Sequence, residues 1–253
     1  MHKRFTDRVV AVTGAGGGLG RASALAFAKE GAQLVLLDID DALMQQTATL
    51  LRSAGTTCST HRVDLSVESD IKRVAAEVCA KYPKLHVLYN NAGLAYGEIA
   101  YGFIDLSMEK WLRFFAINSV APLLLAQALR PSLAAAHGVV LNQSSMASNM
   151  PGTAYGITKA TLNSMTFGMA HAFAKDGIRV NAIEPGIMET PANLAGLSDE
   201  TYKRVQGMQL LKLHGTADDI ANLALFLASD DARFINCEIV SCDAGNGLRG
   251  WRH

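Results

Sequence analysis

A glycine-rich run near the start of the chain, TGAGGGLG at residues 13–20, separates an apolar segment from an alanine-rich one. The apolar segment at 8–12 predicts a β-strand, and residues 21–30 have the spacing of an amphipathic helix. Glycine tolerates positive φ angles, and its missing Cβ allows a pyrophosphate to approach the amide groups at a helix N-terminus. The run therefore predicts a strand, a nucleotide-binding turn and a helix.

The same alternation of apolar runs and helical patterns continues along the 253 residues. Continuous apolar runs such as 9–12 and 34–37 are typical of strands that helices cover on both faces. The pattern predicts one α/β domain over residues 1–253, with a single-domain Rossmann fold and a doubly wound, parallel, seven-stranded sheet flanked by helices on both faces. Strands are expected near 8–13, 32–38, 57–63, 85–90, 137–144, 178–184 and 237–242, and helices near 19–30, 40–54, 67–81, 107–135, 153–175 and 217–229.

Charge and cysteine content exclude several classes of function. Lys plus Arg and Asp plus Glu each number 23, so no basic field is present for nucleic acid or for an anionic membrane. The charged first eight residues are unlike a secretory signal, and the mid-chain apolar run at 120–129 is too short to span a bilayer. The four cysteines form no CxxC pair, and no histidine completes a zinc set. We expect a cytoplasmic protein with no metal site.

A carboxylate at the end of the second predicted strand bears on the choice of cofactor. Asp38 lies 18 residues beyond Gly20, where a carboxylate can accept a hydrogen bond from the 2′-hydroxyl of an adenosine ribose. It would repel a 2′-phosphate, because two like charges ~4 Å apart at an effective dielectric of ~20 interact by roughly 4 kcal/mol. The alternative is a helix N-cap, a role that Asp40 or Asp41 can fill. The sequence therefore favours NAD over NADP.

A phenol and an amine lie one helical turn apart in the second half of the chain. Tyr155 and Lys159 are at i and i+4, so they share one face of the predicted helix. With the glycine run and with Ser144 and Ser145, they resemble the classical short-chain dehydrogenase/reductase family over nearly the whole chain. The glycine run matches the TGxxxGxG loop of that family, the helix matches its YxxxK pair, and the two serines match the pair that closes its fifth strand.

The resemblance implies a role for each matching position. Its other segments are the NNAG run at 90–93, the PGxxxT segment at 185–190 and DAG at 243–245, where the family has DGG. The implied catalytic residues are Asn118, Ser145, Tyr155 and Lys159. The implied cofactor-binding residues are Gly14, Gly18, Leu19, Gly20, Asp38, Asp64, Leu65, Asn91, Ala92, Gly93, Tyr155, Lys159, Pro185, Gly186 and Thr190.

The implied chemistry is the interconversion of a secondary alcohol and its ketone. A tyrosine has a pKa near ~10 and is a weak base at neutral pH, but an adjacent cation favours the phenolate. Lys159 and an oxidised nicotinamide supply that positive charge, so Tyr155 is expected to act as the general acid or base. Ser145 is expected to donate to the substrate oxygen, and Asn118 to support a water chain from Lys159.

Two positions depart from the family pattern. Ser145 lies ten residues before Tyr155 instead of thirteen, so the connection at 146–152 is three residues short, and Ser144 is the alternative catalytic serine. Glu184 stands before Pro185, where small or neutral residues are common in relatives. We hypothesise that Glu184 faces the pocket and binds a second hydroxyl or a cationic group of the substrate. The alternative is a carboxylate satisfied by backbone amides.

The remaining expectations concern the outer parts of the molecule. Residues 187–215 interrupt the alternation and are expected to form a substrate lid or short helical segments. The apolar faces of the Tyr155 helix and of residues 111–129 exceed what one sheet face needs, and the resemblance implies that such helices pair in a homotetramer. The tail at 248–253 extends past the usual family end, and it either reaches a neighbouring subunit or frays. Gln143 is polar inside a predicted strand, and the sequence gives no account of it.

The leading functional prediction is an NAD-dependent oxidoreductase acting on a moderately apolar secondary alcohol or ketone, cyclic ones included. A sugar or polyol dehydrogenase stays open because of Glu184, whereas Asp38 argues against an NADPH-dependent β-ketoacyl reductase. The longer spacing between Tyr and Lys of enoyl reductases is absent. The alternative from a different functional class is a protein that binds NAD as a redox sensor or scaffold and does not turn over a substrate.

Overall fold

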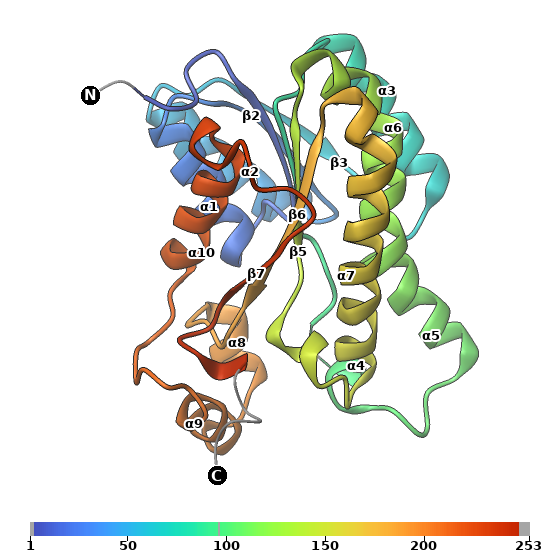
Figure 1. Cartoon of the computed structure of the whole chain (residues 1–253), viewed down its shortest axis with the longest axis vertical. Helices are drawn as coiled ribbons and strands as arrows, with labels where there is room; N and C mark the ends of the chain where they lie inside the picture. Colours follow the sequence, from blue (N-terminus) through green and yellow to red (C-terminus); the bar gives the residue numbers. More distant parts are fainter. Residues whose placement is uncertain (1–2, 96, 248–253) are drawn as a thin grey trace.

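The computed structural model describes residues 3–95 and 97–247. Seven parallel strands form one sheet in the order β3-β2-β1-β4-β5-β6-β7 (Figure 1). The chain starts in the middle of the sheet, builds outward to β3, returns to β4 beside β1, and continues to β7. This is the doubly wound topology predicted from the sequence. The strands are β1 (Val9–Thr13), β2 (Gln33–Asp38), β3 (Cys58–Arg62), β4 (Val87–Asn90), β5 (Val139–Gln143), β6 (Arg179–Pro185) and β7 (Ile239–Cys242).

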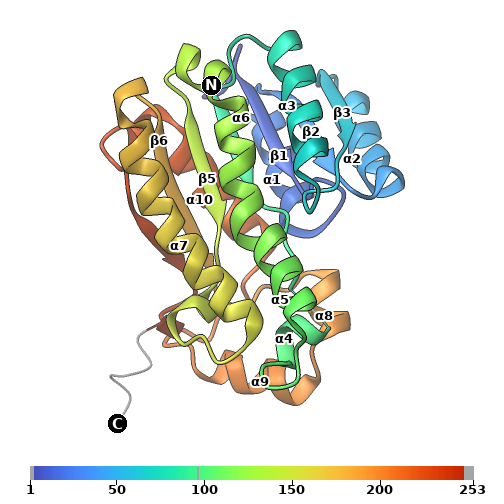
Figure 2. The same ribbon diagram turned by 90° about the vertical axis from the view of Figure 1, so that its right-hand side faces the viewer.

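Helices cover both faces of the sheet (Figures 1 and 2). On one face lie α1 (Gly18–Lys29), α2 (Asp41–Ser53) and α10 (Ala217–Ala228). On the other face lie α3 (Glu68–Lys81), α6 (Ala121–Ala136) and α7 (Ala154–Phe173). These bounds lie within two residues of the predicted helices where a predicted helix is a single element.

The strands supply side chains to two separate cores, one on each face. Val10 and Leu36 join the core under α1, α2 and α10, whereas Ala11 and Leu37 join the core under α3, α6 and α7. Successive side chains of a strand point to opposite faces, so a strand with a core on each side has no polar alternation. The double core is the reason that the strand sequences are continuously apolar.

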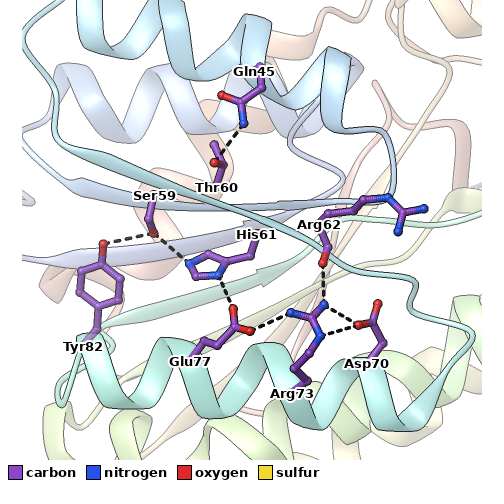
Figure 3. A network of polar contacts seen from close by, with 9 residues as sticks. All are labelled: Gln45, Ser59, Thr60, His61, Arg62, Asp70, Arg73, Glu77 and Tyr82. Atoms are coloured by element: carbon purple, nitrogen blue, oxygen red, sulfur yellow. Dashed lines mark hydrogen bonds and ion pairs between the residues drawn. The ribbon is translucent and has the colours of Figure 1, made fainter.

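The edge strand β3 departs most from this pattern, because its sequence CSTHR is mostly polar. Figure 3 shows its side chains joined to α3 in a network that contains His61, Arg73 and Glu77. Arg73 donates to Asp70 and to Glu77, and Asp70 in turn accepts from the backbone N–H of Asp64 at 2.7 Å. The network therefore fixes the turn after β3, which contains Asp64, one of the predicted cofactor-binding residues.

The predicted helix at 107–135 is composed of three parts. α5 (Met108–Phe115) and α6 are joined by a π-helical turn at Ala116–Val120 (η1), which contains Asn118. Residues 108–136 are long enough and apolar enough to cross a membrane by length and composition alone, and 44% of the apolar 18-residue stretch within them is buried. Leu125 and Leu129 belong to the core under the sheet, and such a core position accounts for the apolar composition.

The segment at 187–215 contains two short helices, α8 (Pro191–Gly196) and α9 (Asp199–Gly207). Together with α4 (Glu98–Tyr101), they lie beyond the ends of the strands where the parallel sheet carries its ligand site (Figures 1 and 2). The expectation of short helical segments is confirmed. The tail at 248–253 lies outside the described residues.

Candidate active site

The glycine turn is tied to the NNAG segment by hydrogen bonds to the main chain. Thr13 Oγ1 accepts from the backbone N–H groups of Asn91 and Ala92, each at 2.9 Å. The Asn91 amide donates back to the carbonyl oxygens of Thr13 at 2.9 Å and Gly14 at 3.3 Å. Because β1 and β4 are neighbours, two motifs that are almost eighty residues apart meet at one edge of the sheet.

The glycines of this turn have two distinct uses. Gly14 has φ +65°, and a Cβ there would lie 2.9 Å from the Asn91 amide nitrogen; a Cβ on Gly20 would collide with the carbonyl of Gly14. Gly17 and Gly18 instead face open space. The N-terminus of α1 begins there and has no side-chain cap among the described residues. Open space over uncapped amides fits the pyrophosphate of a dinucleotide.

Asp38 lies beside this turn, as predicted. One carboxylate oxygen accepts from Gly16 N–H at 2.7 Å and the other from Asp40 N–H at 3.0 Å. The helix-capping role belongs to Asp40, which accepts from Leu43 N–H at 2.9 Å. Asp38 is therefore not required as the cap of α2.

Sequence analysis missed a cation next to Asp38. Arg21, on α1, donates to Thr47 Oγ1 at 2.9 Å, to Gln46 at 3.3 Å and to the carbonyl of Gly16, whose N–H binds Asp38. The position of this arginine, directly after Gly20, is a signal that the sequence itself offers.

The Asp64 carboxylate is held at the end of β3 by Ser66. Its oxygen accepts from the Ser66 backbone N–H at 2.8 Å and hydroxyl at 2.6 Å. Leu65 packs against the core under α3. Both residues thus border the same end of the sheet as Asp38.

Lys159 is buried inside the site with only 3% of its surface exposed. Its ammonium donates to the carbonyl of Gln143 at 2.6 Å and lies 5.8 Å from the centroid of the Tyr155 ring. Both residues are on α7, which Thr153 caps by accepting from Gly156 N–H at 3.1 Å. Burial lowers the pKa of Lys159 from 10.5 to about 8, because desolvation disfavours the charged amine.

The structure explains the polar residue in β5. The Gln143 side chain accepts a hydrogen bond from the buried hydroxyl of Tyr89, on the neighbouring strand β4. Burial raises the pKa of Tyr89, so this phenol stays protonated and remains a donor. The bond fixes the strand at the carbonyl that holds Lys159.

The π-helical turn brings Asn118 to the same place. Its side chain accepts from Leu94 N–H at 2.7 Å and donates to Leu94 O at 2.9 Å and to Thr158 Oγ1 at 3.1 Å. A Cβ on Gly93 would lie 3.1 Å from the Asn118 oxygen and 3.3 Å from the Lys159 nitrogen. The absence of a side chain at 93 therefore lets the NNAG segment approach both groups.

The two serines after β5 differ in accessibility. Ser144 is 1% exposed, and its hydroxyl donates to the carbonyl of Lys159 at 3.5 Å. Ser145 is half-buried, and its Oγ accepts from Ala147 N–H at 3.2 Å at the start of a 3₁₀ turn, Met146–Asn149 (η2). This difference supports Ser145, the half-buried hydroxyl, as the one that meets a substrate.

The PGxxxT segment closes the other side of the site. Gly186 N–H donates to Cys242 O at 2.9 Å, and a Cβ on Gly186 would lie 2.7 Å from the Cα of Asp243, in the DAG segment. Thr190 is buried, and it lines the same hollow as Gly18. Pro185 thus ends β6, and Gly186 begins the segment that leads to Thr190 beside the glycine turn.

Glu184 does not have the environment that we expected of a substrate-binding group. Its side chain is 3% exposed, and both oxygens accept hydrogen bonds from side chains of this protein. The expected orientation into the pocket is wrong, because internal donors satisfy both oxygens of the carboxylate. The alternative was close in kind, but the donors are side chains and not backbone amides.

Comparisons with known proteins agree with this geometry. A family model described as enoyl-(acyl carrier protein) reductase matches residues 14–246. A 2,5-dichloro-2,5-cyclohexadiene-1,4-diol dehydrogenase of Sphingobium indicum is 32% identical, over 97% of this chain and 98% of its own length. An NAD-dependent glycerol dehydrogenase of Listeria innocua is 33% identical, over 97% and 96% respectively.

Solved structures extend the likeness to the fold. A 7α-hydroxysteroid dehydrogenase complexed with NADH and 7-oxo glycochenodeoxycholic acid has a TM-score of 0.90 and 27% identity, and the match covers 96% of each chain. Similar structures include complexes with NADH and with NADP. The glycine turn, the NNAG segment and the Tyr155–Lys159 pair all lie within the matched region. This chain belongs to the classical short-chain dehydrogenase/reductase family of NAD(P)-dependent oxidoreductases.

Proposed function

We propose that this protein is an NAD-dependent oxidoreductase that interconverts a secondary alcohol and its ketone, with Tyr155 as the general acid or base. The observation that carries the proposal is the buried amine of Lys159 beside the Tyr155 ring, with Asn118 and Gly93 packed around it. A buried amine with a lowered pKa in such a cluster is typical of a catalytic site.

The residues of the chain divide the proton chemistry between them. The glycine turn and Asp38 would hold NAD, which would supply the acceptor for the hydride of the alcohol carbon. Tyr155 takes the hydroxyl proton, and the ammonium of Lys159 favours the phenolate that this step requires. Ser145 donates a hydrogen bond to the substrate oxygen, which orients the reacting carbon. In ketone reduction Tyr155 returns the proton.

The preference for NAD is supported by the position of Asp38 beside Gly16. A carboxylate there accepts from a ribose hydroxyl and repels a 2′-phosphate. The neighbouring Arg21 donates to Thr47, Gln46 and two backbone carbonyls, so its guanidinium is engaged in hydrogen bonds within the protein. The same preference argues against an NADPH-dependent β-ketoacyl reductase.

We propose a moderately apolar, ring-containing substrate. Apolar side chains such as Met150, Leu194 and Leu211 are exposed on the turn, on α8 and just after α9, near the catalytic end of the sheet. The names of the diol and hydroxysteroid dehydrogenases point the same way. A polyol substrate is the second candidate, because a similar protein is a glycerol dehydrogenase. The four-residue step from Tyr155 to Lys159 argues against enoyl reduction.

Residues 187–215 are proposed to act as the substrate lid, and the assembly is proposed to be a homotetramer. Met108 and Leu112, on α5, are 78% and 63% exposed, and Phe167 on α7 is also exposed. A second copy of the chain would cover these apolar groups. The four cysteines are free thiols, which suits a cytoplasmic location.

The direct test is NADH production across a panel of cyclic alcohols, polyols and hydroxy acids, with wild type and Tyr155→Phe. We expect turnover of at least one alcohol with NAD, and a loss of roughly 100- to 10,000-fold in kcat for the variant with NADH affinity retained. NADH binding without turnover of any substrate would instead identify a redox sensor or scaffold. Equal activity of Tyr155→Phe would remove the proposed mechanism.

A further inference from the structure

The carboxylate of Glu184 joins four parts of the chain at one buried point. Oε1 accepts from Ser148 Oγ at 2.5 Å and from Asn163 Nδ2 at 2.8 Å. Oε2 accepts from Asn149 Nδ2 at 3.1 Å and from Ser241 Oγ at 3.0 Å. The donors come from the turn after β5, from α7 and from β7, while Glu184 itself is on β6.

The electrostatics of this cluster are unusual for a purely structural contact. No arginine, lysine or histidine of the described residues pairs with Glu184, so every donor to it is neutral. Burying a carboxylate costs free energy unless hydrogen bonds replace its hydration. Four donors replace it here, and two of them belong to one short turn. The cost of burial is therefore offset only while the turn keeps its position.

That turn leads directly to the proposed catalytic hydroxyl. Ser148 and Asn149 end the 3₁₀ turn that begins after Ser145, and the N–H of Ala147 in the same turn donates to Ser145 Oγ at 3.2 Å. A connected path therefore runs from the Glu184 carboxylate, through the turn, to the Ser145 side chain. Displacement of the turn would move the hydrogen-bond donor that fixes the Ser145 rotamer.

We propose that Glu184 is a positioning residue that anchors the turn carrying Ser145, in place of the three residues by which the connection from Ser145 to Tyr155 is shortened. The turn is held against α7 by the bond that Asn163 Nδ2 donates to Ser148 Oγ at 3.0 Å, and the Glu184 carboxylate adds two bonds to the turn from β6. The inference rests on the proposed function, because it takes Ser145 as the group that meets the substrate oxygen.

Three variants separate this role from general stabilisation. Glu184→Gln retains the shape but places an NH₂ group against one of the two donor pairs, so at least one bond to an asparagine amide is lost. The double variant Ser148→Ala/Asn149→Ala removes both bonds between the turn and Glu184, together with the bond that Asn163 donates to Ser148 Oγ. Ser241→Ala is the matched control, because it removes a bond to the same carboxylate without touching the turn.

Amide hydrogen exchange at 146–152, NADH affinity and alcohol kinetics are measured for each variant. We expect Glu184→Gln and the double variant to lose protection at 146–152 and to lose about 10- to 100-fold in kcat, the range expected when a reacting group is misplaced. NADH affinity should stay within about twofold, because the glycine turn is untouched. Ser241→Ala should keep exchange protection at 146–152 and kcat close to wild type.

The outcomes decide between the two roles and between this inference and the function on which it rests. Equal losses of exchange protection and kcat in Ser241→Ala and in the double variant would overturn the proposal that Glu184 anchors the turn. Wild-type protection at 146–152 in the double variant would overturn it as well. If Glu184→Gln does not fold, the other two variants give the answer. If the wild type oxidises no alcohol, the proposed function fails, while the exchange pattern still reports on the anchor.

Discussion

The cofactor side and the substrate side of this site are held together in different ways. On the cofactor side, Thr13, Asn91 and Asp38 bind mainly to backbone N–H and C=O groups of the glycine turn and its neighbours. On the substrate side, Glu184 binds only side chains, from positions 21 to 57 residues away along the chain. Backbone partners are present whatever the sequence, whereas side-chain partners must each be specified. The first side therefore depends little on which side chains surround it, whereas the second is particular to this chain.

Lys159 lies between the two sides, and its removal should have the largest effect. Lys159→Met is expected to lower kcat by about 100- to 10,000-fold, because Tyr155 loses the charge that favours its phenolate. The same variant should unfold at a higher temperature at pH 7, since the burial cost of the ammonium disappears. A pKa of about 8 against 10.5 corresponds to a gain of at most about 3 kcal/mol.

The stability gain should depend on pH in a defined direction. Below pH 8 Lys159 is charged in both the folded and the unfolded chain, so folding bears the full burial cost. Between pH 8 and 10.5 the folded chain binds fewer protons than the unfolded chain, so wild-type stability rises with pH. Thermal melts at pH 7 and pH 10 should show the advantage of Lys159→Met shrinking. A constant advantage would contradict the buried charge.

The backbone dependence of the cofactor side is tested by two glycines three residues apart. Gly20→Ala should destabilise the fold by about 3 kcal/mol and abolish NADH binding, because its Cβ would collide with the Gly14 carbonyl. Gly17→Ala should change the free energy of unfolding by no more than about 0.5 kcal/mol. The φ of Gly17, −162°, suits any residue, and no atom lies within 4 Å of an added Cβ. Similar losses of stability in both variants would show that the turn is not packed as described.

Cofactor choice sharpens the comparison further. Asp38→Asn should raise the ratio of kcat/KM for NADP over NAD by about 100-fold, because the repulsion of a 2′-phosphate is removed. Asp41→Asn is the control, because this exposed carboxylate is the first residue of α2. Steady-state kinetics with both cofactors measure the ratio. An unchanged ratio would mean that another group sets the preference.

The smallest effect is expected in the proposed lid. Glu189 accepts from Tyr202 at 2.9 Å and pairs with His214 at 2.5 Å, and these contacts hold the pKa of Glu189 below its usual value. These contacts contribute their full stability above the ordinary pKa of a glutamate. That contribution disappears as the pH falls through the lowered pKa of Glu189. Tyr202→Phe should change kcat by no more than about twofold, since exposed pairs contribute little.

Limited proteolysis within 191–207 gives the local measurement for this pair. Cleavage should be faster in Tyr202→Phe than in wild type, and faster for both at acidic pH. Glu200→Gln, an exposed change on α9 without a role in the pair, should behave like wild type. Equal cleavage of all three proteins would show that the pair does not hold the lid.

The amino-acid sequence by itself determined the parts of this protein whose physics is local. The alternation of apolar runs and helices predicts the doubly wound sheet, and the glycine spacing predicts the turn at α1. The one helical turn between Tyr155 and Lys159 places them on one face, as α7 does in the structure. These features need only dihedral preferences, helical periodicity and the order of strands.

The tertiary structure decided the roles of isolated polar residues. The role of Gln143 is defined by two contacts of the folded chain: its side chain accepts from Tyr89 on β4, and its carbonyl accepts from Lys159. Glu184 could face a substrate or the protein, and only the positions of three other elements settle that it faces the protein. A buried polar group is defined by the partners that remove it from water, and those partners are distant in sequence.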